Sequence, residues 1–137
     1  MNRDDFRSLA QVRLSEAKVL LKAGRPDGAY YLAGYAVECA LKACIARETK
    51  RYDFPDRAKA QDSHTHDLKL LVRVARLEVG RVERVKHDAE FGDNWEIVQR
   101  WSERSRYERK TLEAAKSLLD AVADSKYGVM RWIQQHW

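Results

Sequence analysis

Two arginines and a tyrosine lie close together in residues 101–107, and their chemistry suits phosphate groups. A guanidinium group donates several hydrogen bonds in one plane, so Arg104 and Arg106 could bind a phosphate. Tyr107 could stack against a base or offer its hydroxyl group. Because an arginine stays protonated and cannot act as a base, these residues predict phosphate binding rather than cleavage. The competing interpretation is that both arginines are solvated residues in a turn between helices.

A second group of charged side chains falls on positions that should be buried. Arg13 lies within an apolar stripe that residues 6–21 form at helical spacing, and Glu38 and Lys42 lie one turn apart in an apolar segment. Burial of an unpaired charge is costly, so we expect Arg13 to pair with Glu38, or Glu38 to pair with Lys42. The functional alternative is a polar pocket inside the fold.

Residues 64–67, with the sequence His-Thr-His-Asp, could indicate a metal site. Such a site needs further ligands on other helices, and a helix start with Thr65 as its N-cap and Asp67 in its first turn explains the residues as well. We therefore expect no metal and no cofactor. Three basic residues follow on one side of that helix, where they form either a solvated surface or a phosphate-backbone contact: Lys69, Arg73 and Arg76.

Helical periodicity and turn residues define the elements that would position these groups. We expect residues 51–64, which include Pro55, to be the one long loop, and we expect Gly80 and residues 92–94 to end or weaken helices. Residues 81–92 are ambiguous. The predicted helices cover residues 6 to about 24, 27 to about 50, 65 to about 80, 95–102 and 107–123, with a short helix after Gly128.

These elements predict an all-α fold, an antiparallel bundle of about five helices plus a short C-terminal helix, in a single domain over residues 1–137. Residues 27–50 are apolar nearly all round, so this helix should be central. Gly34 within it costs about 1 kcal/mol relative to alanine. Close packing of a neighbouring element could offset that cost.

The composition excludes some classes of protein. The net charge of +5 is spread along the chain, so it allows an acidic partner but does not identify one. Cys39 and Cys44 lie in one helical pattern where a disulfide is unfavourable, which predicts reduced thiols and a cytoplasmic protein. No apolar stretch reaches the roughly 18 residues of a membrane helix, and residues 1–10 are too charged for a signal peptide.

Residues 29–43 (AYYLAGYAVECALKA) resemble the signature helix of HEPN domains, in which aromatic and small residues precede a Glu and then a Lys one turn later. Residues 66–68, 101–107 and 128–137 are also similar to small bacterial and archaeal members, so the resemblance covers nearly the whole chain. It implies a bundle of antiparallel helices that commonly forms a homodimer. It also implies a small nucleotidyltransferase partner, encoded alongside in a toxin–antitoxin-like pair.

The resemblance also raises the question of catalysis, because many HEPN proteins are metal-independent ribonucleases. Their site is an Arg followed after four to six residues by a His, near the start of the last long helix. Here residues 104–109 supply arginines, but residues 110–113 contain no histidine. Three Arg–His pairs with the family spacing occur elsewhere, as chance predicts in a chain with 16 arginines: Arg57 with His64, Arg81 with His87, and Arg131 with His136. The pair of Arg131 and His136 is the best placed of the three.

The leading hypothesis is therefore a non-catalytic or weakly catalytic HEPN module that binds RNA, a nucleotide or a nucleotidyltransferase through Arg104 and Arg106. We expect it to dimerise through the last helices, because Trp132 and Trp137 should be incompletely buried by one chain. One alternative is a ribonuclease toxin that uses Arg131 and His136, or the two arginines. A second alternative is a purely structural interaction protein.

Overall fold

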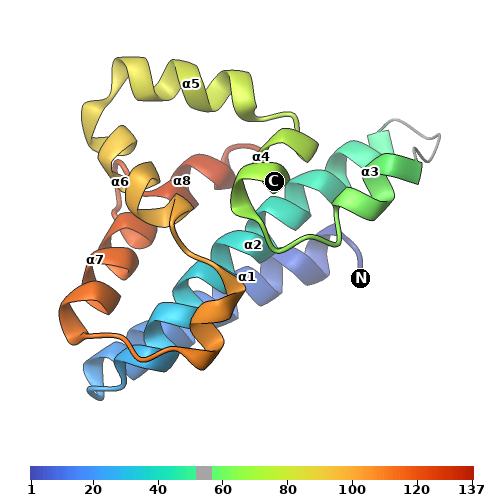
Figure 1. Ribbon diagram of the computed structural model, residues 1–137. Coiled ribbons are helices and arrows are strands. Elements are labelled where there is room, and N and C mark those ends of the chain that lie inside the picture. The colour runs from blue at the N-terminus through green and yellow to red at the C-terminus, as the bar shows by residue number, and fades with distance from the viewer. Residues whose placement is uncertain (52–56) are drawn as a thin grey trace.

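The prediction of an all-α fold is confirmed by a computed structural model, which describes residues 1–51 and 57–137. Figure 1 shows two long helices side by side, with shorter helices stacked on one side of them. Every regular element within the described residues is helical. In this part of the chain no helix combines the length and the apolar character that a membrane span needs.

The two long helices form an antiparallel pair with the most extensive contact in the fold. α1 (Arg3–Lys22) begins with a capping box, in which the Asn2 side chain accepts a hydrogen bond from the Asp5 backbone and the Asp5 side chain accepts one from Asn2. Gly24 has a φ of 74°, which lets the chain reverse before α2 (Pro26–Arg51). Both helices match their predicted ranges closely.

α2 is the centre of the core, as its apolar composition predicts. It contacts α1, α4, η1, α7 and α8. Its two thiols are free and buried, which agrees with the prediction of reduced cysteines. The buried apolar residues of α2 are Ala29, Ala33, Ala36, Val37, Cys39, Ala40, Leu41, Ala43, Cys44 and Ile45.

The middle of the chain departs from the prediction. Residues 51–64 are not one loop, because α2 continues to Arg51 and α3 covers Arg57–Asp62; Pro55 lies outside the described residues. The N-cap of α4 (Leu68–Val74) is Asp67 rather than Thr65. The Asp67 carboxylate accepts hydrogen bonds from two α4 backbone amides, whereas Thr65 Oγ1 accepts one from the backbone of Asp67.

The expected helix ends at Gly80 and at residues 92–94 were wrong. α4 ends at Val74, and Arg76 adopts the left-handed conformation (φ 60°) that more often belongs to glycine after a helix. Gly80 lies inside α5 (Glu78–His87), and residues 92–94 lie inside α6 (Ala89–Gln99). Gly92 is tolerated there because its missing side chain gives room to Val85 of α5.

The last third of the chain follows the prediction with shifted boundaries. Residues 103–107 form the short 3₁₀ helix η1 (Glu103–Tyr107), so the long helix starts later than expected, as α7 (Leu112–Ala123) with Thr111 as its cap. α8 (Val129–Gln134) is the predicted C-terminal helix.

The two terminal tryptophans are not exposed, which corrects the expectation that one chain buries them incompletely. Trp132 is 3% exposed and packs against Phe91, with 5.3 Å between ring centroids. Trp137 is 8% exposed and lies beneath the guanidinium group of Arg7. Both rings therefore contribute to the core of the single chain.

Candidate anion-binding site

The short helix η1 is held in place by an aromatic contact with α2. Trp101 is buried just before η1, and its ring stacks on Tyr31 with 6.0 Å between centroids. A Cβ atom at position 34 would overlap the Trp101 ring, so the glycine makes room for the indole. Ser102 then caps η1 by accepting a hydrogen bond from the Arg104 backbone at 3.1 Å.

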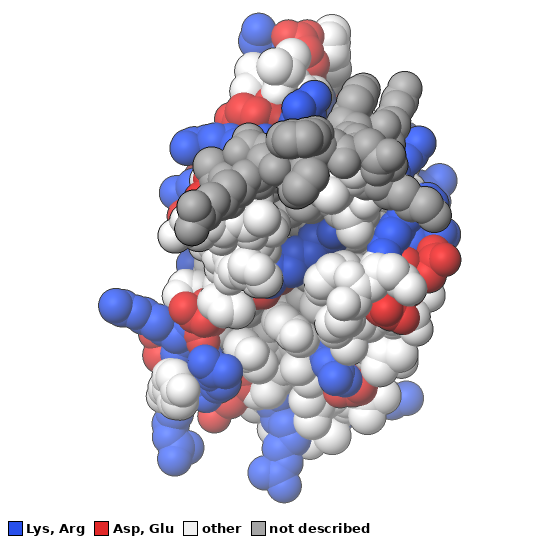
Figure 2. All heavy atoms as spheres, turned by 90° about the vertical axis from the view of Figure 1, so that its right-hand side faces the viewer, with Lys and Arg blue, Asp and Glu red and all other residues white. Residues whose placement is uncertain are grey.

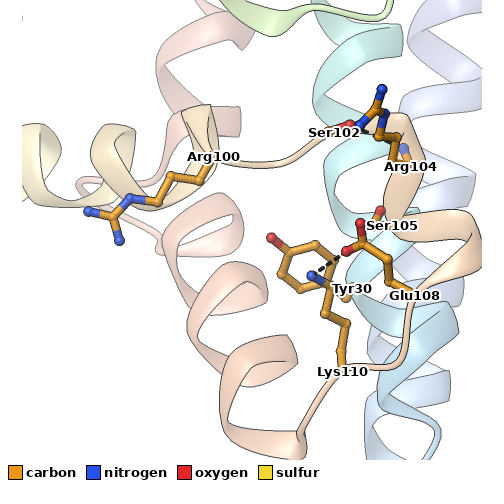
Figure 3. A pocket seen from close by; sticks show the side chains of 7 residues that line it. All are labelled: Tyr30, Arg100, Ser102, Arg104, Ser105, Glu108 and Lys110. Atoms are coloured by element: carbon orange, nitrogen blue, oxygen red, sulfur yellow. Dashed lines mark hydrogen bonds and ion pairs between the residues drawn. The ribbon is translucent and has the colours of Figure 1, made fainter.

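A pocket of about 400 Å³ opens where the start of α2, the end of α6, η1 and the residues before α7 meet. Figure 3 shows the side chains of Tyr30, Glu108, Lys110 and Ser105 close together, whereas Arg100 extends away from them. Three of the lining residues are basic. The full lining is Tyr30, Arg100, Ser102, Arg104, Ser105, Glu108 and Lys110.

The polar groups of this pocket favour an anion. Lys110 Nζ lies 2.9 Å from Glu108 Oε2 and 4.4 Å from the Tyr30 ring centroid, and the Glu108 hydrogen bond raises the pKa of Lys110. The hydroxyl of Ser105 is buried and has no hydrogen-bond partner among the described residues. Buried hydroxyls are usually satisfied, so this group is available to a ligand.

Arg106 and Tyr107 lie outside the pocket lining. The Arg106 guanidinium is placed over the ring of Tyr31 at 5.9 Å and over the ring of Tyr107 at 5.1 Å. Tyr107 is 82% exposed. An exposed ring beside an arginine can stack on a nucleic-acid base. Of the three residues predicted in this segment, only Arg104 lines the pocket, while Arg106 and Tyr107 flank it.

Glu38 is buried, 1% exposed, and its partners differ in part from the prediction. Lys42 Nζ lies 3.0 Å from Glu38 Oε1, which confirms the expected pair within α2. Arg13 does not pair with Glu38, because Glu16, one turn further along α1, binds it instead. The other partner of Glu38 is His66, whose Nδ1 lies 2.7 Å from the same oxygen.

His66 also reaches η1, since its Nε2 lies 3.2 Å from Glu103 Oε2. His64 is exposed, and Asp67 serves as the cap of α4. Within residues 1–51 and 57–137 no three His, Cys, Asp or Glu side chains are grouped so that they could hold a metal ion.

The basic residues in α4 and directly after it do not line this pocket. Lys69, Arg73 and Arg76 are exposed. Arg84 of α5 pairs with Asp88 and lies over the Phe91 ring. On the face shown in Figure 2, Lys and Arg side chains are mixed with Asp and Glu, so that face presents no continuous basic patch.

The predicted catalytic pair lies elsewhere. Arg131 is exposed on α8, and His136 is half-buried with its ring edge-on to Trp132 at 5.7 Å. Burial, and secondarily the charge of Arg47, lowers the pKa of His136. Neither residue lines the pocket.

The pair of Arg81 and His87 is not brought together as a site. Arg81 is bound by Glu78 and lies over the Trp95 ring, while His87 lies 3.8 Å from Glu83. The side chain of Arg57, the predicted partner of His64, lies outside the described part.

Sequence reasoning missed four of the pocket residues that now matter most, namely Tyr30, Arg100, Ser105 and Lys110. Arg100 and Lys110 flank the segment that was singled out, so a wider window around it would have included them. Tyr30 is distant in sequence, and only the packing of η1 on α2 brings it close. The His66–Glu38 contact has no sequence signal, because its two residues are 28 positions apart.

Comparison with known proteins identifies one family. The family model of the HEPN domain matches residues 4–128. No match was found among curated proteins or among solved structures.

Proposed function

Since the chain belongs to the HEPN domain family, we propose that it is a binding module for RNA or a nucleotide, with phosphate bound at the junction of α2, η1 and α7. One observation carries this proposal: the pocket combines Arg104 and Lys110 with the buried hydroxyl of Ser105, which has no hydrogen-bond partner in the described part of the chain. Its volume of about 400 Å³ lies within the range of small-molecule sites.

The chemistry of binding follows from the geometry. Arg104 and Ser105 can donate hydrogen bonds to phosphate oxygens, and Lys110 adds a positive charge once a ligand competes with Glu108 for it. A base on the same strand could stack on Tyr107 beside Arg106. The site therefore combines phosphate binding with a stacking surface and needs no sequence-specific contact.

The biological setting is also a proposal, supported by family membership. We infer a homodimer that associates with a small nucleotidyltransferase in a toxin–antitoxin-like pair. The two free, buried thiols suit a reducing compartment, which supports a cytoplasmic location.

Fluorescence anisotropy with a short single-stranded RNA tests the phosphate site. We expect Arg104→Ala together with Lys110→Ala to weaken binding at least about tenfold, because two charged hydrogen-bond donors are lost. The slope of log affinity against log salt should fall by roughly 0.7 for each phosphate contact removed.

The matched control is Arg109→Ala, which removes an exposed arginine of the same segment that does not line the pocket. Equal weakening by the control variant would contradict the proposed site. The same RNA, incubated with the protein in chelator, should stay intact. Cleavage that is lost in His136→Ala would instead establish the ribonuclease alternative.

A further inference from the structure

The imidazole of His66 bridges two carboxylates from different elements. Its Nδ1 lies 2.7 Å from Glu38 Oε1 of α2, and its Nε2 lies 3.2 Å from Glu103 Oε2 of η1. His66 itself precedes α4. We call this arrangement the His66 bridge. It connects the central helix to the first residue of η1 through a single side chain.

Protonation decides whether this bridge can be complete. A neutral imidazole carries one N–H group, so it can donate a hydrogen bond to only one of the two carboxylates. The imidazolium ion carries two, and its positive charge attracts both carboxylates: the contact with Glu38 is a hydrogen bond, and the contact with Glu103 is an ion pair. Histidine side chains in general change between these two forms near neutral pH.

Charged groups from two elements surround the ring. Glu38 and Lys42 face the ring from α2, and Glu103 faces it from η1. The formal charges of these three groups sum to −1 (−1, +1 and −1), and a charged His66 makes the cluster neutral. The neighbouring charge of Asp67 is already engaged as the cap of α4.

The bridge acts on the pocket through η1. Glu103 is the first residue of η1, and three neighbouring residues of that segment line the pocket: Ser102, Arg104 and Ser105. When Glu103 is bound to His66, the start of η1 is fixed against α2, and the donors of Arg104 and Ser105 are held in position. When the ion pair with Glu103 is lost, this end of η1 is still held by the Ser102 cap and by the packing of Trp101.

We propose that protonated His66 is a positioning residue for the anion site, so that RNA binds more tightly at low pH than at high pH. This inference rests on the proposed phosphate-binding function. His66 itself does not contact the ligand. The His66 bridge holds η1 in its binding conformation.

The first experiment measures RNA affinity by anisotropy at about pH 6 and about pH 8. The probe is a single-stranded RNA without terminal phosphates, because its phosphodiester charges do not change between these values. We expect wild-type affinity to fall roughly three- to tenfold at the higher pH, and His66→Gln to remove this difference. A wild-type pH profile in His66→Gln would overturn the proposal. The control is His87→Gln, which removes an exposed histidine that also faces a carboxylate, Glu83, and should keep the wild-type profile.

A second variant separates the bridge from a simple charge effect. Glu103→Ala removes a half-exposed carboxylate next to Arg104, so it should not threaten folding. If only net charge mattered, this variant would bind RNA more tightly at both pH values. The His66 bridge predicts the opposite, weaker binding at about pH 6 and no pH dependence. Tighter binding with an unchanged pH profile would overturn the proposal.

A third readout does not depend on RNA at all. In NMR spectra of the free protein, the backbone amide signals of residues 103–107 should titrate together with the His66 ring, and should stop doing so in His66→Gln. If RNA binds at no pH, the proposed function fails, but these amide signals still test whether the His66 bridge holds η1. Amide signals that do not follow His66 would overturn the bridge, even where RNA binding is confirmed.

Discussion

Glu38 shows at the scale of one residue how far sequence reasoning reaches. Its pairing with Lys42 follows from helical spacing alone and is confirmed at 3.0 Å. Its contact with His66 depends on how α2 meets the start of α4, which no local pattern encodes. Glu38 Oε2 is buried and has no hydrogen-bond partner among the described residues. Replacement of His66 would therefore leave Lys42, which binds Oε1, as the one described partner of the Glu38 carboxylate.

His136 gives a prediction about stability and pH. Burial lowers its pKa below the ordinary value of 6.5, so the folded protein favours the neutral imidazole. As the pH falls through 6.5, the unfolded chain binds this proton first, and the free energy of unfolding decreases until the lowered folded pKa is passed. We expect His136→Gln to lose less stability than the wild type between about pH 7 and about pH 5.

Urea unfolding at a series of pH values measures this effect. His64→Gln is the control, because His64 is exposed and should leave the pH dependence unchanged. If the free energy of unfolding changes with pH equally in His136→Gln and the wild type, the burial of this ring has no energetic consequence.

At the scale of elements, the two longest helices were predicted closely, whereas most of the short helices, apart from the C-terminal one, were not. α1, α2 and α8 lie close to their expected positions, whereas α3 was missed and α4, α5, α6 and η1 were misplaced. The reason is physical. Short helices are stabilised mainly by tertiary contacts, and glycines such as Gly80 and Gly92 are tolerated inside them when exposed or when a neighbour needs the space.

The contact of Gly34 with Trp101 predicts the effect of two alanine substitutions. Gly34→Ala should destabilise the protein by roughly 1–3 kcal/mol, because the new methyl group overlaps a buried indole and outweighs the gain in helix propensity. Because Trp101 anchors η1, the variant should also weaken RNA binding.

Gly80→Ala is the matched control for this substitution. It lies in α5, where a Cβ atom would meet nothing within 4 Å, so it should be neutral or stabilise by up to about 1 kcal/mol. Thermal and urea unfolding compare the two variants. Equal stability of Gly34→Ala and the wild type would mean that Trp101 can move without cost.

At the scale of the whole molecule, the all-α class and the central position of α2 followed from composition and periodicity. The pocket did not, because it is assembled from the start of α2 and from residues 100–110, which only the folded chain brings together. Likewise, the burial of Trp132 and Trp137 depends on packing that the sequence does not reveal.

The oligomeric state is the prediction that belongs to the whole molecule. Family membership supports a homodimer, but the buried tryptophans no longer supply a reason for an interface at the last helices. We expect sedimentation equilibrium at micromolar concentration to give twice the chain mass of 16.0 kDa. A single species of monomer mass would contradict the dimer and leave the anion site as a property of one chain.

The buried thiols of α2 have a practical consequence for spectroscopy. Burial raises the pKa of Cys39 to about 11 and that of Cys44 to about 12, and thiolate is the form that reacts with maleimides. A cysteine introduced at an exposed position, for example by Ser125→Cys, would therefore be the preferred point of attachment for a dye. Fluorophores can thus be placed on the surface of the folded protein while its native cysteines stay in the sequence.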